Sequence, residues 1–188
     1  FSVFYAETSS RTGFSSAIKC WSCGRDLHSV SRREARHPSE WLALNRRGFV
    51  AVKQRTIAYC RRHHVPAVLL YLDLDGFKGV NDRLGHAAGD AALVRVAELM
   101  LANLRESDAV GRLGGDEFAL LMLNAGLEEG RAKARQLAAR LEAEPFVWNG
   151  DSAPLGGSFG VRAWDGHGDP EVWLAEADAA MWVRKKGR

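Results

Sequence analysis

Hydrophobic and polar positions change period several times along the chain, and these changes mark out helices and strands. Residues 67–75, AVLLYLDLD, form a continuous apolar run that is short and rich in β-favouring residues, as in a central strand buried on both faces. Apolar residues recur at helical spacing in four longer segments, so we predict helices at about residues 40–63, 86–105, 127–144 and 170–186. Both kinds of element therefore alternate through most of the sequence.

Two further apolar segments, AVGRL and DEFALLML, flank Gly114-Gly115. A two-residue connection of this composition closes a β-hairpin with a primed turn, which predicts a hairpin over residues 109–123. Shorter strands are expected at about residues 146–148 and 155–163. The order strand, helix, hairpin, helix, strands, helix predicts an α/β (α+β) sandwich, in which helices pack on a mixed central sheet.

Composition sets the domain organisation. The 188 residues are 46% hydrophobic, enough for one domain with a real core. Residues 1–38 lack sustained periodicity and are rich in Ser and Arg, so we assign them to an N-terminal tail or linker and residues 39–188 to the folded domain. The net charge of +3 and the absence of a basic patch interleaved with aromatic residues argue against a nucleic-acid polymer as partner.

Localisation follows from three absences in the sequence. No apolar run approaches the roughly 20 residues of a membrane helix. The N-terminus does not look like a signal peptide, and three cysteines, an odd number, do not suggest a disulfide framework. We therefore expect a cytoplasmic domain.

Carboxylates gather where the apolar strand and the hairpin end. Asp73 and Asp75 are two apart in a strand and therefore point to the same face. If the hairpin lies beside this strand, Asp116 arrives next to Asp73 and completes a cluster of oxygen ligands suited to Mg²⁺ and a phosphate-bearing substrate. Each piece alone is ordinary turn chemistry, whereas their combination, with glycines that let a ligand approach the backbone closely, favours a metal and phosphate site.

Four segments resemble the motifs of one enzyme family, the GGDEF domains of diguanylate cyclases. The matching segments are DLDGFKGVND at 73–82, GHAAGD at 85–90, GGDEF at 114–118 and SFGVRA at 158–163, and the resemblance extends from about residue 45 to the C-terminus. It implies a fold similar to nucleotide cyclases and polymerase palms. It also implies condensation of two GTP into cyclic di-GMP with release of two pyrophosphates, and a homodimer, because each protomer would hold one GTP.

The resemblance assigns roles to individual residues. Asp73 and Asp116 would be ligands of Mg²⁺, with Mn²⁺ as an alternative, and the Leu74 carbonyl would contribute. Glu117 would assist deprotonation of the attacking 3′-hydroxyl or bind a second metal.

Guanine would be read by Asn81 and Asp90, and an ionised Asp suits the N1–H and N2 amino donors of guanine. The remaining substrate contacts would come from Lys78, Gly114, Gly115, Lys185 and Arg188.

RESD, residues 105–108, has the spacing to GGDEF of the family's RxxD inhibitory site for cyclic di-GMP. The resemblance therefore implies product inhibition through Arg105 and Asp108. The alternative without that context is an Arg at a helix C-terminus with a partner three residues on. The planar guanidinium suits phosphate and guanine edges, which favours the inhibitory site.

Two departures from the family pattern leave a second function open. The family's DxLTGLxNRR signature is reduced here to ALNRR, and the terminal A-K-x-x-G-R is one residue shorter between Lys185 and Arg188. The alternative to an active cyclase is a GGDEF module with little turnover that acts as a receptor for cyclic di-GMP or GTP. In either case we expect an upstream sensor domain in the full-length protein, which can itself be attached to a membrane.

Two other motifs indicate different chemistry. CWSCG at residues 20–24 has the spacing of half a zinc site, with His28 and His37 as further ligands, although two free thiols in a tail are the preferred interpretation. GGSFG at residues 156–160 matches the nucleophile pattern of hydrolases. Ser158 lies within a strand-like run rather than on a strand-to-helix turn, which argues against a hydrolase.

Overall fold

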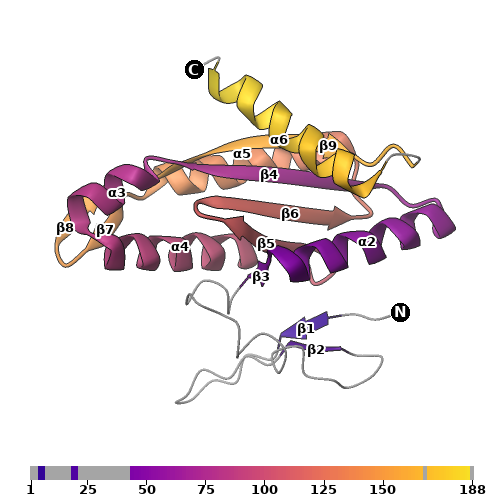
Figure 1. Cartoon of the computed structure of the whole chain (residues 1–188), viewed down its shortest axis with the longest axis horizontal. Helices are drawn as coiled ribbons and strands as arrows, with labels where there is room; N and C mark the ends of the chain where they lie inside the picture. The colour runs from indigo at the N-terminus through magenta and orange to yellow at the C-terminus, as the bar shows by residue number, and fades with distance from the viewer. Residues whose placement is uncertain (1–3, 7–17, 21–42, 167–168, 187–188) are drawn as a thin grey trace.

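The computed structural model describes residues 4–6, 18–20, 43–166 and 169–186 (Figure 1). Its elements, in chain order, are β1 (Phe4–Ala6), β2 (Ile18–Cys20), β3 (Leu44–Asn45), α2 (Arg46–His63), β4 (Ala67–Asp75), α3 (Phe77–Leu84), α4 (His86–Leu101), β5 (Ala109–Gly114), β6 (Glu117–Leu123), α5 (Leu127–Ala143), β7 (Phe146–Trp148), β8 (Asp151–Ala153), β9 (Gly156–Ala163) and α6 (Pro170–Lys186).

The central sheet has five strands in the order β3-β5-β6-β4-β9. Neighbouring strands run antiparallel except β3 and β5, which are parallel, so the sheet is mixed. Two small antiparallel pairs, β1 with β2 and β7 with β8, stand apart from it. The mixed sheet with packed helices confirms the fold class that the order of elements predicts.

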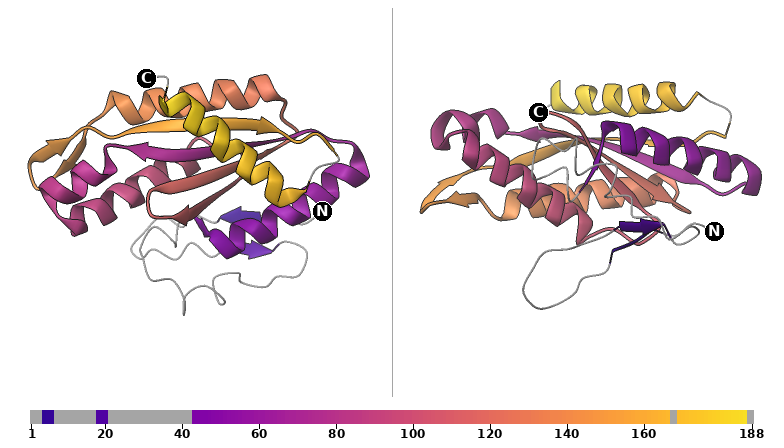
Figure 2. Two further views of the ribbon diagram at one scale, coloured as in Figure 1. Left: turned by 45° about the horizontal axis from the view of Figure 1, so that its top comes forward. Right: turned by 60° about the horizontal axis from the view of Figure 1, so that its bottom comes forward.

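Helices cover both faces of the sheet, and the long strand β4 lies between two hydrophobic clusters (Figure 2). On one face Val68, Leu70 and Leu72 pack with buried residues of α4 and α5. On the other, Leu69 and Tyr71 pack with buried residues of α2 and α6. β4 is thus buried on both faces, as its unbroken apolar sequence predicts. No helix in the described part of the chain is long and apolar enough to cross a membrane.

The predicted helix at 40–63 begins later than expected. Leu44 and Asn45 form strand β3, which pairs with Gly111 and Arg112, and helix α2 starts at Arg46. The side-chain oxygen of Asn45 accepts a hydrogen bond from the Gly48 N–H at 2.8 Å and so caps the helix. The Asn of the NRR segment is therefore a helix start signal.

The region between β4 and β5 also differs from the prediction. Residues 77–84 form a separate helix, α3, which the sequence pattern did not indicate. The predicted helix at 86–105 ends at Leu101, and the Asn103 side chain donates to the Leu99 carbonyl at 2.7 Å just beyond it. Gly85, with φ of 85° and ψ of 165°, separates the two helices. This backbone conformation lies outside the helical region and suits glycine, which explains the sharp corner.

The hairpin turn is one residue later than predicted. Gly114 pairs with Glu117, so the connecting residues are Gly115 and Asp116 rather than Gly114-Gly115. Gly115 has a φ of 48°, as the first central residue of a primed turn requires.

A second hairpin, formed by β7 and β8, is predicted only in part. β7 matches the expected strand at 146–148, whereas the sequence pattern does not indicate β8. The expected strand at 155–163 is β9, which begins at Gly156.

Close packing of α6 on β9 depends on Gly160. A Cβ atom at Gly160 would lie 1.9 Å from the Ala177 carbonyl oxygen and 2.5 Å from the Met181 nitrogen, both in the backbone of α6. A side chain there would push the whole helix off the sheet, because a helix backbone cannot yield as a flexible side chain can.

Gly160→Ala should therefore lower the free energy of unfolding by roughly 3 kcal/mol, measured from urea-induced unfolding. Gly79→Ala is the matched control, because a Cβ at Gly79 in α3 would meet no atom within 4 Å. That control should keep or gain stability, by up to about 1 kcal/mol. Equal unfolding midpoints for the two variants would contradict this account of the α6 packing.

Candidate functional site

Three acidic residues meet where β4 and the β5–β6 hairpin end. In the sheet register Asp73 stands opposite Glu117. The Leu74 N–H donates to the Asp116 carbonyl oxygen at 3.3 Å, which fixes the hairpin tip against the end of β4. The structure thus brings the backbones of Asp73, Asp116 and Glu117 side by side, as expected if the hairpin lies beside the strand.

A lysine from the end of α6 lies on the carboxylates of β4. The Lys185 ammonium donates a hydrogen bond to Asp73 Oδ1 and lies 3.4 Å from Asp75 Oδ1. Burial lowers the pKa of Lys185, but the hydrogen bonds and negative charges of Asp73 and Asp75 outweigh that effect and raise it above its usual value. The positive charge of Lys185 thus offsets the repulsion between the two carboxylates.

Ser158 holds Asp75 from the neighbouring strand. Its hydroxyl donates to Asp75 Oδ2 at 2.8 Å, and its side chain is buried within β9. This location on a strand confirms that Ser158 does not occupy the strand-to-helix turn of a hydrolase nucleophile.

Glu117 has a tyrosine beside it. Tyr71 is two residues before Asp73 on the same face of β4, and its hydroxyl hydrogen-bonds to the Glu117 carboxylate. Burial, this hydrogen bond and the nearby negative charges of Glu117 and Asp178 raise the pKa of Tyr71, so the hydroxyl stays protonated and can donate. Sequence reasoning missed Tyr71, because within an apolar strand it cannot be told from a core residue.

The hairpin tip is open on the side of its glycines. A Cβ at Gly114 or Gly115 would meet no atom within 4 Å. The turn is braced by Arg112, whose Nε–H donates to the Gly115 carbonyl at 2.9 Å. The tip can therefore present bare backbone to a ligand while its own conformation is fixed. Arg112 is a second residue that the sequence did not single out.

The carboxylates suit a hard divalent cation. No three His, Cys, Asp or Glu side chains of the described residues are arranged so that they could hold a metal ion by themselves. Mg²⁺ does not need such a set, because it binds through one or two carboxylates and takes further ligands from water and substrate phosphates. Asp73, which already binds the Lys185 ammonium, and the neighbouring Asp116 and Glu117 fit that requirement.

The predicted guanine-reading residues meet at the corner between α3 and α4. Asn81 is half-buried in α3, and its amide lies against Gly89 in α4. Asp90, the next residue along α4, is exposed. Lys78 is exposed in the first turn of α3, directly after the strand that carries Asp73. An amide, a carboxylate and an ammonium group therefore come from the two helices that follow the strand of Asp73 in the chain.

Comparison with known families gives a match to "Diguanylate cyclase, GGDEF domain" over residues 43–188. This chain belongs to the GGDEF domain family. Relatives include the probable diguanylate cyclase DgcE of Escherichia coli, 42% identical over 126 residues, and the diguanylate cyclase TpbB of Pseudomonas aeruginosa, 36% identical over 165 residues. These matches cover 66% and 86% of this chain, but 11% and 38% of the relatives, so the chain spans well under half of their length.

Solved GGDEF structures share the fold. The GGDEF domain of TpbB from P. aeruginosa superposes with a TM-score of 0.71 at 36% identity, over 78% of this chain and 92% of that one. A microbial GGDEF domain described for its interaction with cyclic di-GMP superposes with a TM-score of 0.72 at 35% identity, over 84% and 94% of the two chains.

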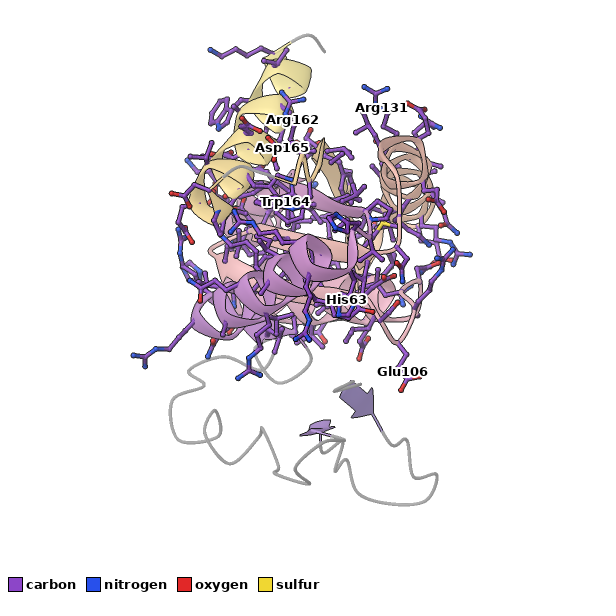
Figure 3. All side chains as sticks on the ribbon, turned by 90° about the vertical axis from the view of Figure 1, so that its right-hand side faces the viewer. His63, Glu106, Arg131, Arg162, Trp164 and Asp165 are labelled. Carbon is purple, nitrogen blue, oxygen red and sulfur yellow. The ribbon has the colours of Figure 1, made fainter. Side chains whose placement is uncertain are left out.

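The candidate inhibitory residues of this GGDEF domain form a tight turn away from the acidic cluster. The Asp108 carboxylate accepts from the Arg105 N–H at 3.1 Å, and the Asp108 N–H donates to the Arg105 carbonyl at 3.0 Å. Because α4 ends at Leu101, Arg105 lies beyond the helix, contrary to the helix-terminus alternative. Arg105 is exposed, and Figure 3 shows its neighbour Glu106 projecting away from the domain. The length of β5, about 20 Å, separates this turn from Gly114.

Some predicted residues lie outside the described part of the chain. They are Arg188, an expected substrate contact, and the residues other than Cys20 that make up the candidate zinc motif, namely Cys23, His28 and His37. For Cys20 only its place in β2 is described.

Lys185 and a divalent cation would compete for Asp73. We expect Lys185→Gln to bind Mn²⁺ more tightly than the unaltered chain when no nucleotide is present, because the charge that offsets the carboxylates is gone. Calorimetric titration with Mn²⁺ alone measures this. Lys186→Gln, which changes the exposed neighbouring lysine, should leave the affinity unchanged. Weaker Mn²⁺ binding by Lys185→Gln would show that this lysine supports the cation site instead of competing for it.

Proposed function

We propose that this chain is the catalytic domain of a diguanylate cyclase, which condenses two GTP into cyclic di-GMP and releases two pyrophosphates. The observation that carries the proposal is the register of β4 and β6, which places Asp73 opposite Glu117 and the Asp116 backbone against Leu74. Membership of the GGDEF family and relatives named diguanylate cyclases support the same activity.

In this proposal, Asp73, Asp116 and the Leu74 carbonyl hold Mg²⁺, with Mn²⁺ as an alternative, and Glu117 can add a further oxygen ligand. The bound metal would neutralise the triphosphate and the charge that develops on the leaving pyrophosphate. Glu117 accepts the proton of the attacking 3′-hydroxyl, and the Tyr71 hydroxyl holds its carboxylate in place. Lys185 and Lys78 supply positive charge to the phosphates, while Gly114 and Gly115 leave room for them.

Specificity for GTP would come from the corner between α3 and α4. The Asp90 carboxylate accepts hydrogen bonds from N1–H and the N2 amino group of guanine, and the Asn81 amide completes the contact. Adenine presents an acceptor at N1, so it would leave the carboxylate without a donor, which is a strong basis for rejection. Each domain holds one GTP, and two copies facing each other would complete the reaction.

The second candidate is a receptor that binds cyclic di-GMP or GTP with little turnover. The reduced ALNRR segment, which lacks the Asp-x-Leu-Thr portion of the family signature, favours it. Here Asn45 serves as a helix cap and Arg46 donates to the Leu113 carbonyl at 3.5 Å, so the remaining part of the signature has structural roles. Incubation of the purified protein with GTP and Mg²⁺, followed by chromatography, separates the two functions.

Cyclic di-GMP should form in that incubation, and Asp116→Ala should lower its rate of formation by about 100-fold or more, because the divalent cation that would neutralise the triphosphate loses a carboxylate ligand. Asp151→Ala, which removes an exposed aspartate on the β7–β8 hairpin, is the matched control and should keep the full rate. An undiminished rate in Asp116→Ala would disprove the metal assignment. Bound nucleotide without turnover in the unaltered protein would favour the receptor.

We further propose that cyclic di-GMP inhibits the enzyme by binding at Arg105 and Asp108. Arg105→Ala should weaken cyclic di-GMP binding at least about tenfold, because a charged hydrogen bond to phosphate is lost, while GTP binding stays the same. Calorimetry with each nucleotide measures both affinities. Glu106→Ala, in the same exposed turn, is the control. If Arg105→Ala bound product as tightly as the unaltered protein, the inhibitory site would lie elsewhere.

A further inference from the structure

Gly89 lies under the side chain of Asn81. A Cβ atom built at Gly89 would fall 2.0 Å from Asn81 Oδ1, 2.9 Å from its Cγ and 3.3 Å from its Nδ2. These three nearest atoms all belong to the same amide group, so that group occupies the place that a side chain at residue 89 would take. Gly89 is buried, whereas Asn81 is half-buried and keeps part of its surface available to a ligand.

The backbone around this contact is fixed by the corner between the helices. The Gly85 N–H donates to the Asn81 carbonyl at 2.9 Å, and the Gly89 N–H donates to the Gly85 carbonyl at 3.2 Å. These two bonds link Asn81 to Gly89 through a single residue. The backbone of Asn81 therefore has little freedom, and the surface presented by α4 determines where its amide can lie.

Adding a methyl group at Gly89 would move the amide without unfolding the domain. The clash involves the far end of one polar side chain, which can rotate away, rather than the backbone. Alanine is also preferred over glycine in a helix by about 1 kcal/mol. Gly89→Ala should therefore change the direction of one side chain while the helix is retained, in contrast to Gly160→Ala.

We propose that Gly89 is a positioning residue for base recognition: its bare Cα lets the Asn81 amide lie flat on α4 beside Asp90, where both can reach one purine edge. This inference rests on the proposed function, because it assumes that Asn81 and Asp90 read guanine. The inference adds that base recognition requires a glycine at position 89 of α4, which does not itself touch the base. Gly89 would act by allowing the correct position of Asn81 in α3.

The test is the affinity for 3′-deoxyGTP and 3′-deoxyATP, which lack the attacking hydroxyl and so report binding without turnover. Gly89→Ala should weaken 3′-deoxyGTP binding about tenfold, because a misplaced amide leaves a polar contact unmade. Binding of 3′-deoxyATP should change much less, so the discrimination between the two bases should shrink. Gly79→Ala, an alanine added to α3 in open space, should alter neither affinity.

A double-mutant cycle shows whether the effect passes through Asn81. In an Asn81→Ala background, Gly89→Ala should cost nothing further, because the group that it displaces is absent. An equal loss in both backgrounds would overturn the proposal, and so would unchanged 3′-deoxyGTP binding by Gly89→Ala when Asn81→Ala alone binds weakly. If Asn81→Ala itself bound 3′-deoxyGTP normally, the guanine assignment would be wrong, and the inference would fall with it.

Thermal unfolding of each variant shows whether the domain is folded. If Gly89→Ala does not fold, a second variant still tests the proposal. Asn81→Gln keeps the amide but moves it outward by one methylene, so it should weaken 3′-deoxyGTP binding by a similar factor while leaving α4 unaltered. Unchanged binding by Asn81→Gln would also overturn the proposal, because the position of the amide would then not matter.

Discussion

The pairing of β4 with a strand on each side is the constraint on which the candidate site depends. Residues 67–73 of β4 oppose β6, and residues 68–75 oppose β9. A slip of one residue would turn every side chain of β4 to the other face, so that Asp73 would enter the core and Leu72 would face the site. Hydrophobic burial on both faces of the sheet therefore also determines where the carboxylates point.

The acidic groups at the end of β4 lie beside residues from three other parts of the chain. Lys185 comes from α6, Ser158 from β9, and the hairpin tip comes with its arginine brace from β5. None of these partners is close to Asp73 in sequence. The positive charge of Lys185 thus reaches Asp73 and Asp75 when the last helix is packed on the sheet, which links the electrostatics of the site to the packing of α6 on Gly160.

The sequence predicted those features that depend on the local pattern of apolar residues or on the spacing of a motif. The apolar run of β4 and the hairpin were recognisable, and together they predicted that Asp116 would lie near Asp73. The short helix α3 was missed, because residues 77–84 bury only Val80 within the helix and so lack an apolar stripe. The start of α2 was misplaced, because a two-residue strand carries no periodicity.

Side-chain partners were the least predictable part of the site. Tyr71, Arg112 and Ser158 act on Glu117, Gly115 and Asp75 through contacts that exist only across strands or turns. The hydrogen bond between Lys185 and Asp73 joins residues that are 112 positions apart in the sequence. The family resemblance predicted Lys185 as a substrate contact, but it could not show that Asp73 and Asp75 themselves hold this lysine.

The parallel pairing of β3 with β5 gives the start of the domain a mechanical connection to the hairpin tip. Leu44 and Asn45 are paired with Gly111 and Arg112, and Arg46 donates to the Leu113 carbonyl, two residues before Gly115. A displacement of β3 along its axis therefore cannot leave β5 in place without breaking these bonds. A force that acts on the β3 end of the domain would therefore be transmitted to the Gly115-Asp116 turn through β5 and the Arg46 hydrogen bond, across the irregular register between Arg112 and Gly114.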